Sequence, residues 1–239
     1  MNVVVGYDGS DYSMQALDWA MDEAELRRLP LTVAHAWQWP YGEADEEAKL
    51  HLRKAAEHVL WHGADCARHV SSVGKVETDL YEGKAAERLV TLSGEADLVV
   101  VGSRGLGGLP LAVLGSVATQ VATYASCPVV VVRGPGPLPS IAHPGPVVAT
   151  EAEEAVLEFA FREASLQRLS VLALAPLPVT WRERYPEVPA HTGTETPRDA
   201  SLLVVGRPRR GELGRLAGTL LRDARCPVAV VPVTREATS

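Results

Sequence analysis

A glycine-rich segment near the middle of the chain carries the clearest chemical signal in the sequence. An apolar run over residues 98–101 ends at Gly102 and Gly105, and Gly115-Ser116 stands where a helical pattern begins. A buried strand, a glycine turn and a helix N-terminus in this order offer free backbone N–H groups at the positive end of a helix dipole, which suits a phosphate. The glycines let the backbone come close, and the Ser116 hydroxyl adds a donor. We therefore expect a nucleotide in the first half of the chain.

Composition limits the classes of protein that this chain can belong to. Its 239 residues suffice for one large or two small domains, and its formal net charge of −7 argues against a general nucleic-acid partner. No apolar run reaches the about 18 residues that a membrane span needs, so no membrane partner is expected. The chain starts directly with a strand pattern, Val3-Val4-Val5, and its three cysteines are too few for a disulfide framework. We expect a cytoplasmic protein.

The sequence contains one unit twice, and the second copy is shorter. The matching segments are 16–24 with 156–164, 96–102 with 200–206, and 127–132 with 226–231. The offset between the copies falls from 140 residues (16 to 156) to 99 (127 to 226), so the second copy has lost about forty residues. A linker rich in proline and glycine, residues 134–146, separates them. The expected domains are residues 1–138 and 144–239.

Apolar runs alternate with helical patterns throughout the first copy. The expected strands are 2–7, 31–37, 75–80, 97–102 and 128–133, and the expected helices are 12–28, 43–72, 84–93 and 115–125. This alternation predicts an α/β fold: an open, parallel, five-stranded sheet in each copy, with helices on both faces. The second copy is truncated and lacks most of the long second helix. Ligands of such sheets sit at the carboxyl ends of the strands, here at Asp8, Ala36 and Gly102.

Three motifs together resemble the universal stress protein family. They are Gly6-Tyr7-Asp8-Gly9-Ser10, His35-Ala36 at the end of the second strand, and the G-x2-G-x9-G-S spacing of residues 102–116. The resemblance covers residues 1–133 well and 146–233 loosely, and is that of a tandem member with a degenerate second domain. It implies a Rossmann-like fold of the adenine nucleotide alpha hydrolase type, and a regulatory, stress-response role with ATP held by the first domain.

The same resemblance assigns an ATP site by position. Its residues are Gly6, Tyr7, Asp8, Ala36, Val101, Gly102, Arg104, Gly105, Gly115, Ser116 and Val117. It implies that Asp8 contacts the adenosine, that the backbone at Ala36 meets the adenine, and that Gly115, Ser116 and Val117 hold the phosphates, with Mg²⁺ bound through them. Arg104 either adds charge to the phosphate loop or is a solvated loop arginine.

The second copy departs from this pattern at each ligand position. Glu151 follows the strand that corresponds to the Asp8 strand, and the 206–214 loop is five residues shorter than 102–115. Arg-Pro-Arg-Arg fills that loop, and Arg215 replaces the serine. Proline removes a donor and arginine side chains crowd the turn, so no ATP is expected there. The loop arginines either capture another anion or, in the favoured interpretation, form a solvated basic loop.

Other functions stay open from the sequence. An enzyme of this fold would need a signature such as Ser-Gly-Gly-x-Asp-Ser or His-x-Gly-His, and the chain has neither, nor a P-loop Gly-Lys-Ser/Thr. We expect no efficient catalysis, at most slow ATP hydrolysis; a scaffold without ligand is the other alternative. His58 and His62 have the spacing of metal ligands, but a packing or surface role is favoured and no metal site is expected.

The apolar strands 128–133 and 227–232, which end the two units, are expected to pair because an unpaired apolar edge is a liability. Pairing within the chain gives a pseudo-dimer, and pairing between chains a homodimer.

Overall fold

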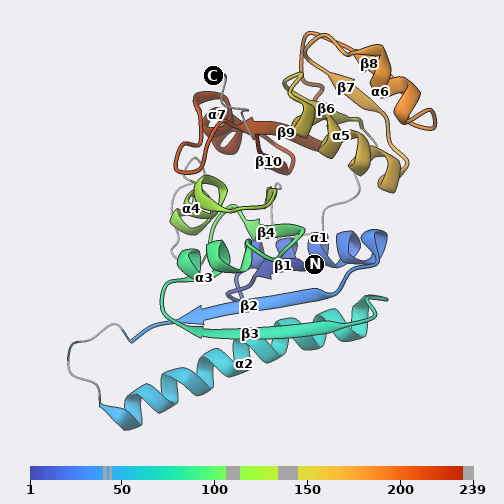
Figure 1. Cartoon of the computed structure of the whole chain (residues 1–239). Coiled ribbons are helices and arrows are strands. Elements are labelled where there is room, and N and C mark those ends of the chain that lie inside the picture. Colours follow the sequence, from blue (N-terminus) through green and yellow to red (C-terminus); the bar gives the residue numbers. More distant parts are fainter. Residues whose placement is uncertain (40–41, 43–44, 106–113, 134–144, 234–239) are drawn as a thin grey trace.

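The structure, a computed structural model, describes residues 1–39, 42, 45–105, 114–133 and 145–233 (Figure 1). Its ten named strands form one sheet in the order β3-β2-β1-β4-β5-β10-β9-β6-β7-β8. Neighbouring strands run parallel except β5 and β10, which are antiparallel. The α/β fold predicted from the sequence is confirmed, and the two expected sheets are halves of a single one.

The first half contains β1 (Val3–Gly6), α1 (Asp11–Arg27), β2 (Leu31–Trp37), α2 (Glu46–Val70), β3 (Val76–Glu82), α3 (Ala85–Leu92), β4 (Leu98–Gly102), α4 (Ser116–Tyr124) and β5 (Val129–Val132). Its helix boundaries follow local signals. Ser10 caps α1 by accepting a hydrogen bond from the Ser13 N–H, and Asp45 caps α2 in the same way from Glu47 N–H. The strand order 3-2-1-4-5 is that of a doubly wound sheet.

The second half repeats this order with fewer elements. It contains β6 (Val147–Ala149), α5 (Glu154–Gln167), β7 (Val171–Ala173), α6 (Val179–Arg184), β8 (Ala190–Thr192), β9 (Leu202–Arg207), α7 (Arg215–Asp223) and β10 (Val228–Pro232). The six-residue α6 stands where the first half has the 25-residue α2. Residues 193–201, all described, form no helix between β8 and β9. The deletion therefore removed the counterpart of α3 as well as most of the long second helix.

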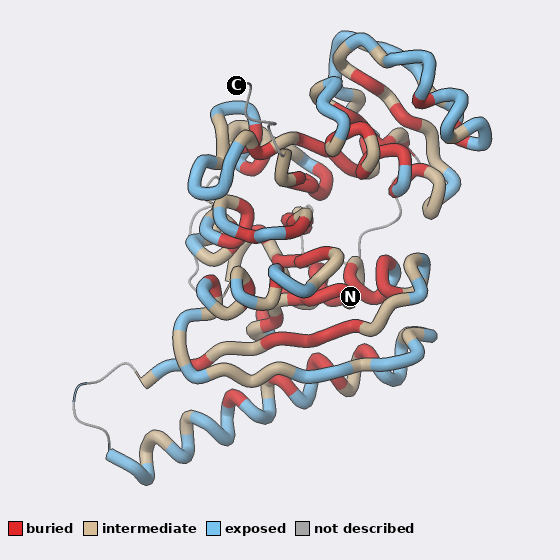
Figure 2. Tube along the Cα trace, in the orientation of Figure 1, coloured by how far each residue is buried: buried red, intermediate tan, exposed pale blue. Residues whose placement is uncertain are grey.

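Helices cover both faces of the sheet because the strands alternate their side chains. Val3 and Val5 point into one apolar core with α1, α2 and α5, whereas Val4 points into the other with α3, α4 and α7. Figure 2 shows the buried stretches continuing along the central strands of both halves. In the part of the chain that the structure describes, no helix combines the length and the apolar character that crossing a membrane requires.

The two halves join through β5 and β10. Val129 pairs with Val230, and Val131 with Val228. The predicted pairing within the chain is therefore present. Each of these strands has a second neighbour, β4 or β9, so the homodimer expected through the same strands has no free edge to use. Most of the predicted linker, and the boundary between residues 138 and 144, lie outside the described residues.

Candidate functional site

A cavity of about 290 Å³ lies where β1, β2 and β4 end and α4 begins. All eleven residues that the sequence analysis placed in one site line this cavity. They meet because parallel strands present their carboxyl ends at one edge of the sheet. The sequence analysis missed one wall, which α3 forms with Ala85, Arg88 and Leu89.

Two glycines of the motif have packing reasons that the spacing alone does not reveal. A Cβ on Gly102 would lie 2.6 Å from the Tyr12 carbonyl oxygen, so this glycine lets β4 approach the first turn of α1. A Cβ on Gly105 would lie 2.5 Å from Asp8 Oδ2, so this glycine brings the loop against the carboxylate. Gly102 therefore serves helix–strand packing, where the sequence analysis expected an approach of the backbone to the ligand.

The first turn of α1 fixes the Asp8 carboxylate. Its Oδ1 accepts hydrogen bonds from the Ser10 N–H at 3.0 Å and from the Ser10 hydroxyl at 2.6 Å. The same hydroxyl oxygen accepts from the Ser13 N–H at 3.2 Å. Asp8 is thus an oriented acceptor in the cavity wall, suited to a ligand hydroxyl or amino group.

The start of α4 is suited to an anion. The N-cap residue Gly115 has no side chain that could accept a hydrogen bond from the first N–H groups, a cap that suits an external acceptor. Residues 115–118 of this turn line the cavity. Arg104 lies beside it, with Nη1 donating to the Tyr12 hydroxyl at 2.8 Å and the guanidinium 5.0 Å above the Tyr12 ring. Arg104 is therefore a half-buried cation of the cavity wall whose position Tyr12 fixes, and its role toward a ligand stays a prediction.

Tyr7 contributes its backbone to the site and turns its side chain away from it. The hydroxyl lies 2.9 Å from His62 Nδ1 on α2, and the ring packs so closely on Gly63 that a Cβ there would be 2.7 Å away. Burial raises the pKa of Tyr7 to about 12, so the hydroxyl stays protonated. His62 is exposed and contacts Tyr7, and His58, also exposed, stacks on Trp61. Within the described residues, no three His, Cys, Asp or Glu side chains are grouped as for a metal.

A salt bridge holds the missed wall in place. Arg88 of α3 donates from Nε to Asp79 Oδ2 at 2.9 Å and from Nη2 to Asp79 Oδ1 at 2.5 Å. Its guanidinium lies 5.3 Å from the Tyr81 ring centroid. The sequence does show Asp79 on a strand and Arg88 on the following helix, nine residues apart. Such a spacing is compatible with an ion pair but does not indicate a ligand site.

The corresponding crevice of the second half, about 340 Å³, has different chemistry. Glu151 Oε2 accepts from the Gly206 N–H at 2.9 Å and therefore covers the end of β9. Glu153 and Glu212 also line the crevice, and Arg209 is paired with Glu212 at 3.1 Å. Three glutamates and two arginines, Arg209 and Arg215, thus line this crevice, whereas the described residues that line the first cavity include one aspartate and no glutamate.

The short loop of the second half binds the first half. Arg207, only 3% exposed, donates to the carbonyl oxygens of Thr123 at 2.5 Å and Ala125 at 2.6 Å. Arg210 Nε donates to the Tyr124 carbonyl oxygen at 2.9 Å. These guanidinium groups satisfy the C-terminal carbonyls of α4. The favoured interpretation of a solvated basic loop is therefore wrong for Arg207, whereas Arg210 is exposed and makes its hydrogen bond at the surface.

Comparison with known proteins agrees with the fold and the motifs. The sequence model of the universal stress protein family matches residues 1–133. The chain belongs to this family. The universal stress protein Rv2624c of Mycobacterium tuberculosis is 32% identical over 261 residues, covering 96% of this chain and 95% of that protein. A universal stress protein of Mycolicibacterium smegmatis is 32% identical over 289 residues, covering 96% of each. A solved universal stress protein from Archaeoglobus fulgidus has the same fold, with a TM-score of 0.72 and 17% identity over 97% of this chain and 98% of that one.

Proposed function

We propose that this universal stress protein binds one ATP per chain in its first half and acts as a regulatory, stress-response protein without efficient catalysis. The proposal rests on three groups that line one cavity: the Asp8 carboxylate, which Ser10 orients, the Arg104 guanidinium, which Tyr12 positions, and the start of α4. Mg²⁺ is proposed to arrive with the phosphates. The three cysteines are all unpaired, which fits a reducing compartment such as the cytoplasm.

The ligand is proposed to lie with its adenosine against β1 and β2 and its phosphates at α4. Asp8 accepts hydrogen bonds from ribose hydroxyls, and the backbone at Ala36 contacts the adenine. The N–H groups of Ser116 and Val117 donate to phosphate oxygens, with the helix dipole favouring the negative charge. Arg104 adds a positive charge at that end.

The walls give little support to an efficient reaction. Among the described residues that line the cavity, Asp8 and His35 have the side chains whose chemistry suits a general base. Both already have partners in the wall: Asp8 accepts from Ser10, and His35 Nδ1 lies 2.8 Å from the Tyr7 carbonyl oxygen. A general base needs to reach the attacking water, so we expect at most slow hydrolysis.

The test is denaturing release of nucleotide from freshly purified protein, followed by mass analysis. Wild type is expected to yield about one adenine nucleotide per chain, and Asp8→Ala and Gly102→Ala are expected to yield none. Gly74→Ala is the matched control, because a Cβ there meets nothing within 4 Å. Circular dichroism checks that each variant is folded.

Each other outcome has a defined meaning. Two nucleotides per chain contradict the assignment to the first half alone. If no nucleotide is found after purification or after titration with ATP and Mg²⁺, ATP binding is contradicted. The chain would then be a scaffold that binds no ligand. Phosphate release over many turnovers would instead favour an enzyme.

A further inference from the structure

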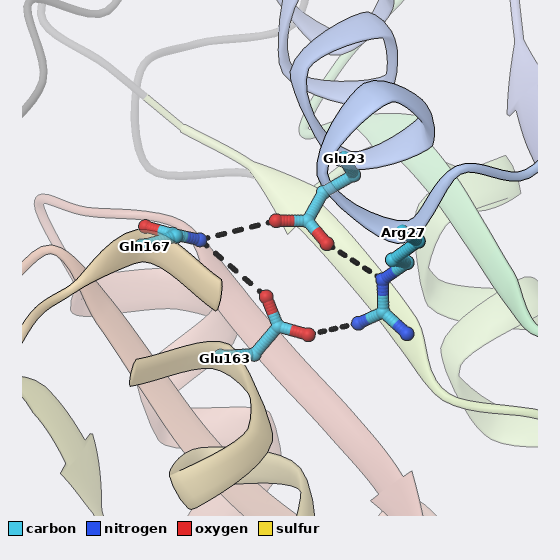
Figure 3. A network of polar contacts seen from close by, with 4 residues as sticks. All are labelled: Glu23, Arg27, Glu163 and Gln167. Atoms are coloured by element: carbon cyan, nitrogen blue, oxygen red, sulfur yellow. Dashed lines mark hydrogen bonds and ion pairs between the residues drawn. The ribbon is translucent and has the colours of Figure 1, made fainter. Parts of the chain in front are cut away.

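Four polar side chains meet where α1 of the first half contacts α5 of the second (Figure 3). Those of Glu23, Arg27 and Glu163 are buried, and Gln167 is half-buried. Arg27 Nε donates to Glu23 Oε2 at 2.7 Å, and Arg27 Nη2 donates to Glu163 Oε1. Gln167 Nε2 donates to Glu23 Oε1 at 3.1 Å and to Glu163 Oε2 at 3.4 Å. The side chains of Glu23 and Arg27 are 2% exposed and that of Glu163 is 0% exposed, so water does not screen their charges.

The internal repeat explains why these residues face one another. The offset of 140 residues places Glu163 at the position of Glu23, and Gln167 at the position of Arg27. Both helices end in the same way, with Arg28 and Arg168 at φ 54° and 57°. Two arginines would balance the two glutamates of a fully symmetric pair. In this chain glutamine stands at one arginine position, and one guanidinium faces two carboxyl groups.

The surroundings add one nearby charge of each sign. Asp97, before β4, adds a negative charge near Arg27, and Arg162 of α5 adds a positive charge near Glu163. The strands beneath contribute apolar side chains to the same core. Burial raises the pKa of Glu163 well above its ordinary value, and the charge of Glu23 and a hydrogen bond between the two carboxyls raise it further, although Arg27 opposes the shift.

We propose that the carboxyl groups of Glu23 and Glu163 share one proton, and that this proton locks the two halves of the chain together. With the proton bound, one carboxylate, one neutral carboxyl and one guanidinium have no net charge. Loss of the proton leaves an uncompensated negative charge in a buried place, which favours separation of α1 from α5. This device is independent of the nucleotide site.

The sign of the pH dependence follows from proton counting. An acid with a raised pKa in the folded chain binds more protons there than in the unfolded chain. Its stabilising effect is complete below the unfolded pKa, about 4.3 for glutamate, and is lost as pH rises through the folded pKa. Within that window the unfolding equilibrium constant rises up to about tenfold per pH unit for one proton.

Urea unfolding of the full chain between pH 5 and 9 tests the proposal. Glu163→Gln keeps the shape and the hydrogen bonds of the neutral carboxyl and is expected to remove this tenfold-per-unit dependence. Gln167→Arg supplies the second cation and is expected to flatten the profile as well. Glu183→Gln, at an exposed position on α6, is the matched control and is expected to run parallel to wild type.

Carboxyl ¹³C NMR of wild type gives a second measurement that needs no stable variant. One glutamate signal is expected to titrate well above pH 4.3, and Glu163→Gln removes it. Parallel unfolding profiles for wild type and Glu163→Gln would overturn the proposal. Full ionisation of all glutamates by pH 5 would overturn it too, as would failure of Glu163→Gln to fold.

Discussion

Replacing Arg27 by methionine removes the guanidinium that lies between two buried carboxyl groups and keeps most of its apolar volume. The Arg27→Met variant is expected to retain contact with Phe159, whose ring centroid lies 5.7 Å from the guanidinium carbon in wild type. Removing one partner from a buried ion pair costs about 3–5 kcal/mol, because the charge left behind has no compensation. Typical domains have about 5–15 kcal/mol of stability in total, so this loss is large.

The expected cost depends on pH. At pH 8 we expect the full loss of about 3–5 kcal/mol in the free energy of unfolding. At pH 5 we expect a smaller loss, because both carboxyls can take up protons when the cation is absent. Urea denaturation followed by circular dichroism at the two pH values measures both quantities. Glu163→Gln in the Arg27→Met background is expected to recover part of the loss at pH 8, since it removes one buried charge.

Arg53→Met is the matched control on the surface. Arg53 Nε donates to Glu57 Oε1 at 3.0 Å on α2, with side-chain exposures of 60% and 49%. Such an exposed pair contributes about 0.3–0.5 kcal/mol. A loss below about 1 kcal/mol for Arg27→Met at pH 8, or an equal loss at both pH values, would refute the reasoning that buried, unpaired charge is the dominant effect.

Two further predictions concern other buried groups. Arg207→Ala removes the side-chain donors to the carbonyl oxygens of Thr123 and Ala125, although the Gly211 N–H still donates to Thr123. It is expected to lower the free energy of unfolding by about 1–3 kcal/mol, with the nucleotide content per chain unchanged. Urea denaturation and mass analysis check both, and unchanged stability would contradict the prediction. Burial raises the pKa of Cys127 to about 12 and that of Cys226 to about 11. Both thiols are therefore expected to resist iodoacetamide at pH 8 in the folded chain and to react in urea, and rapid alkylation of the folded chain, found by peptide mapping, would show the opposite.

Local sequence signals predicted most of the fold. β2 has the predicted bounds 31–37, and the other strands of the first half begin and end within two residues of prediction. Runs of valine and helix caps act over a few residues, so one sequence suffices to find them. The eleven site residues line one cavity because the topology of a parallel sheet brings strand ends and helix starts to one edge.

Contacts between distant segments were not predictable in the same way. The side chain of Tyr7 turns to His62, and Arg207 binds Thr123 and Ala125, although Tyr7 and Arg207 both lie in motifs that the sequence displays. Burial and tertiary geometry choose such partners, and spacing along the chain carries no record of them. The two halves form one sheet because the edge strands β5 and β10 pair with each other, and the sequence does not show which strands lie at the edges.

The pattern of loss in the second half follows from its contacts with the first. The long second helix is shortened and the counterpart of α3, which walls the first cavity, is gone. The elements that contact the first half remain: β10 pairs with β5, and α5 packs on α1. Each half also donates hydrogen bonds to the C-terminal end of a helix in the other half. Arg207 donates to the end of α4, and Arg133 donates to the Arg222 carbonyl oxygen of α7 at 2.7 Å. An uncovered β5 would be an apolar edge open to other chains, so the second half protects the first by keeping the elements that cover that edge.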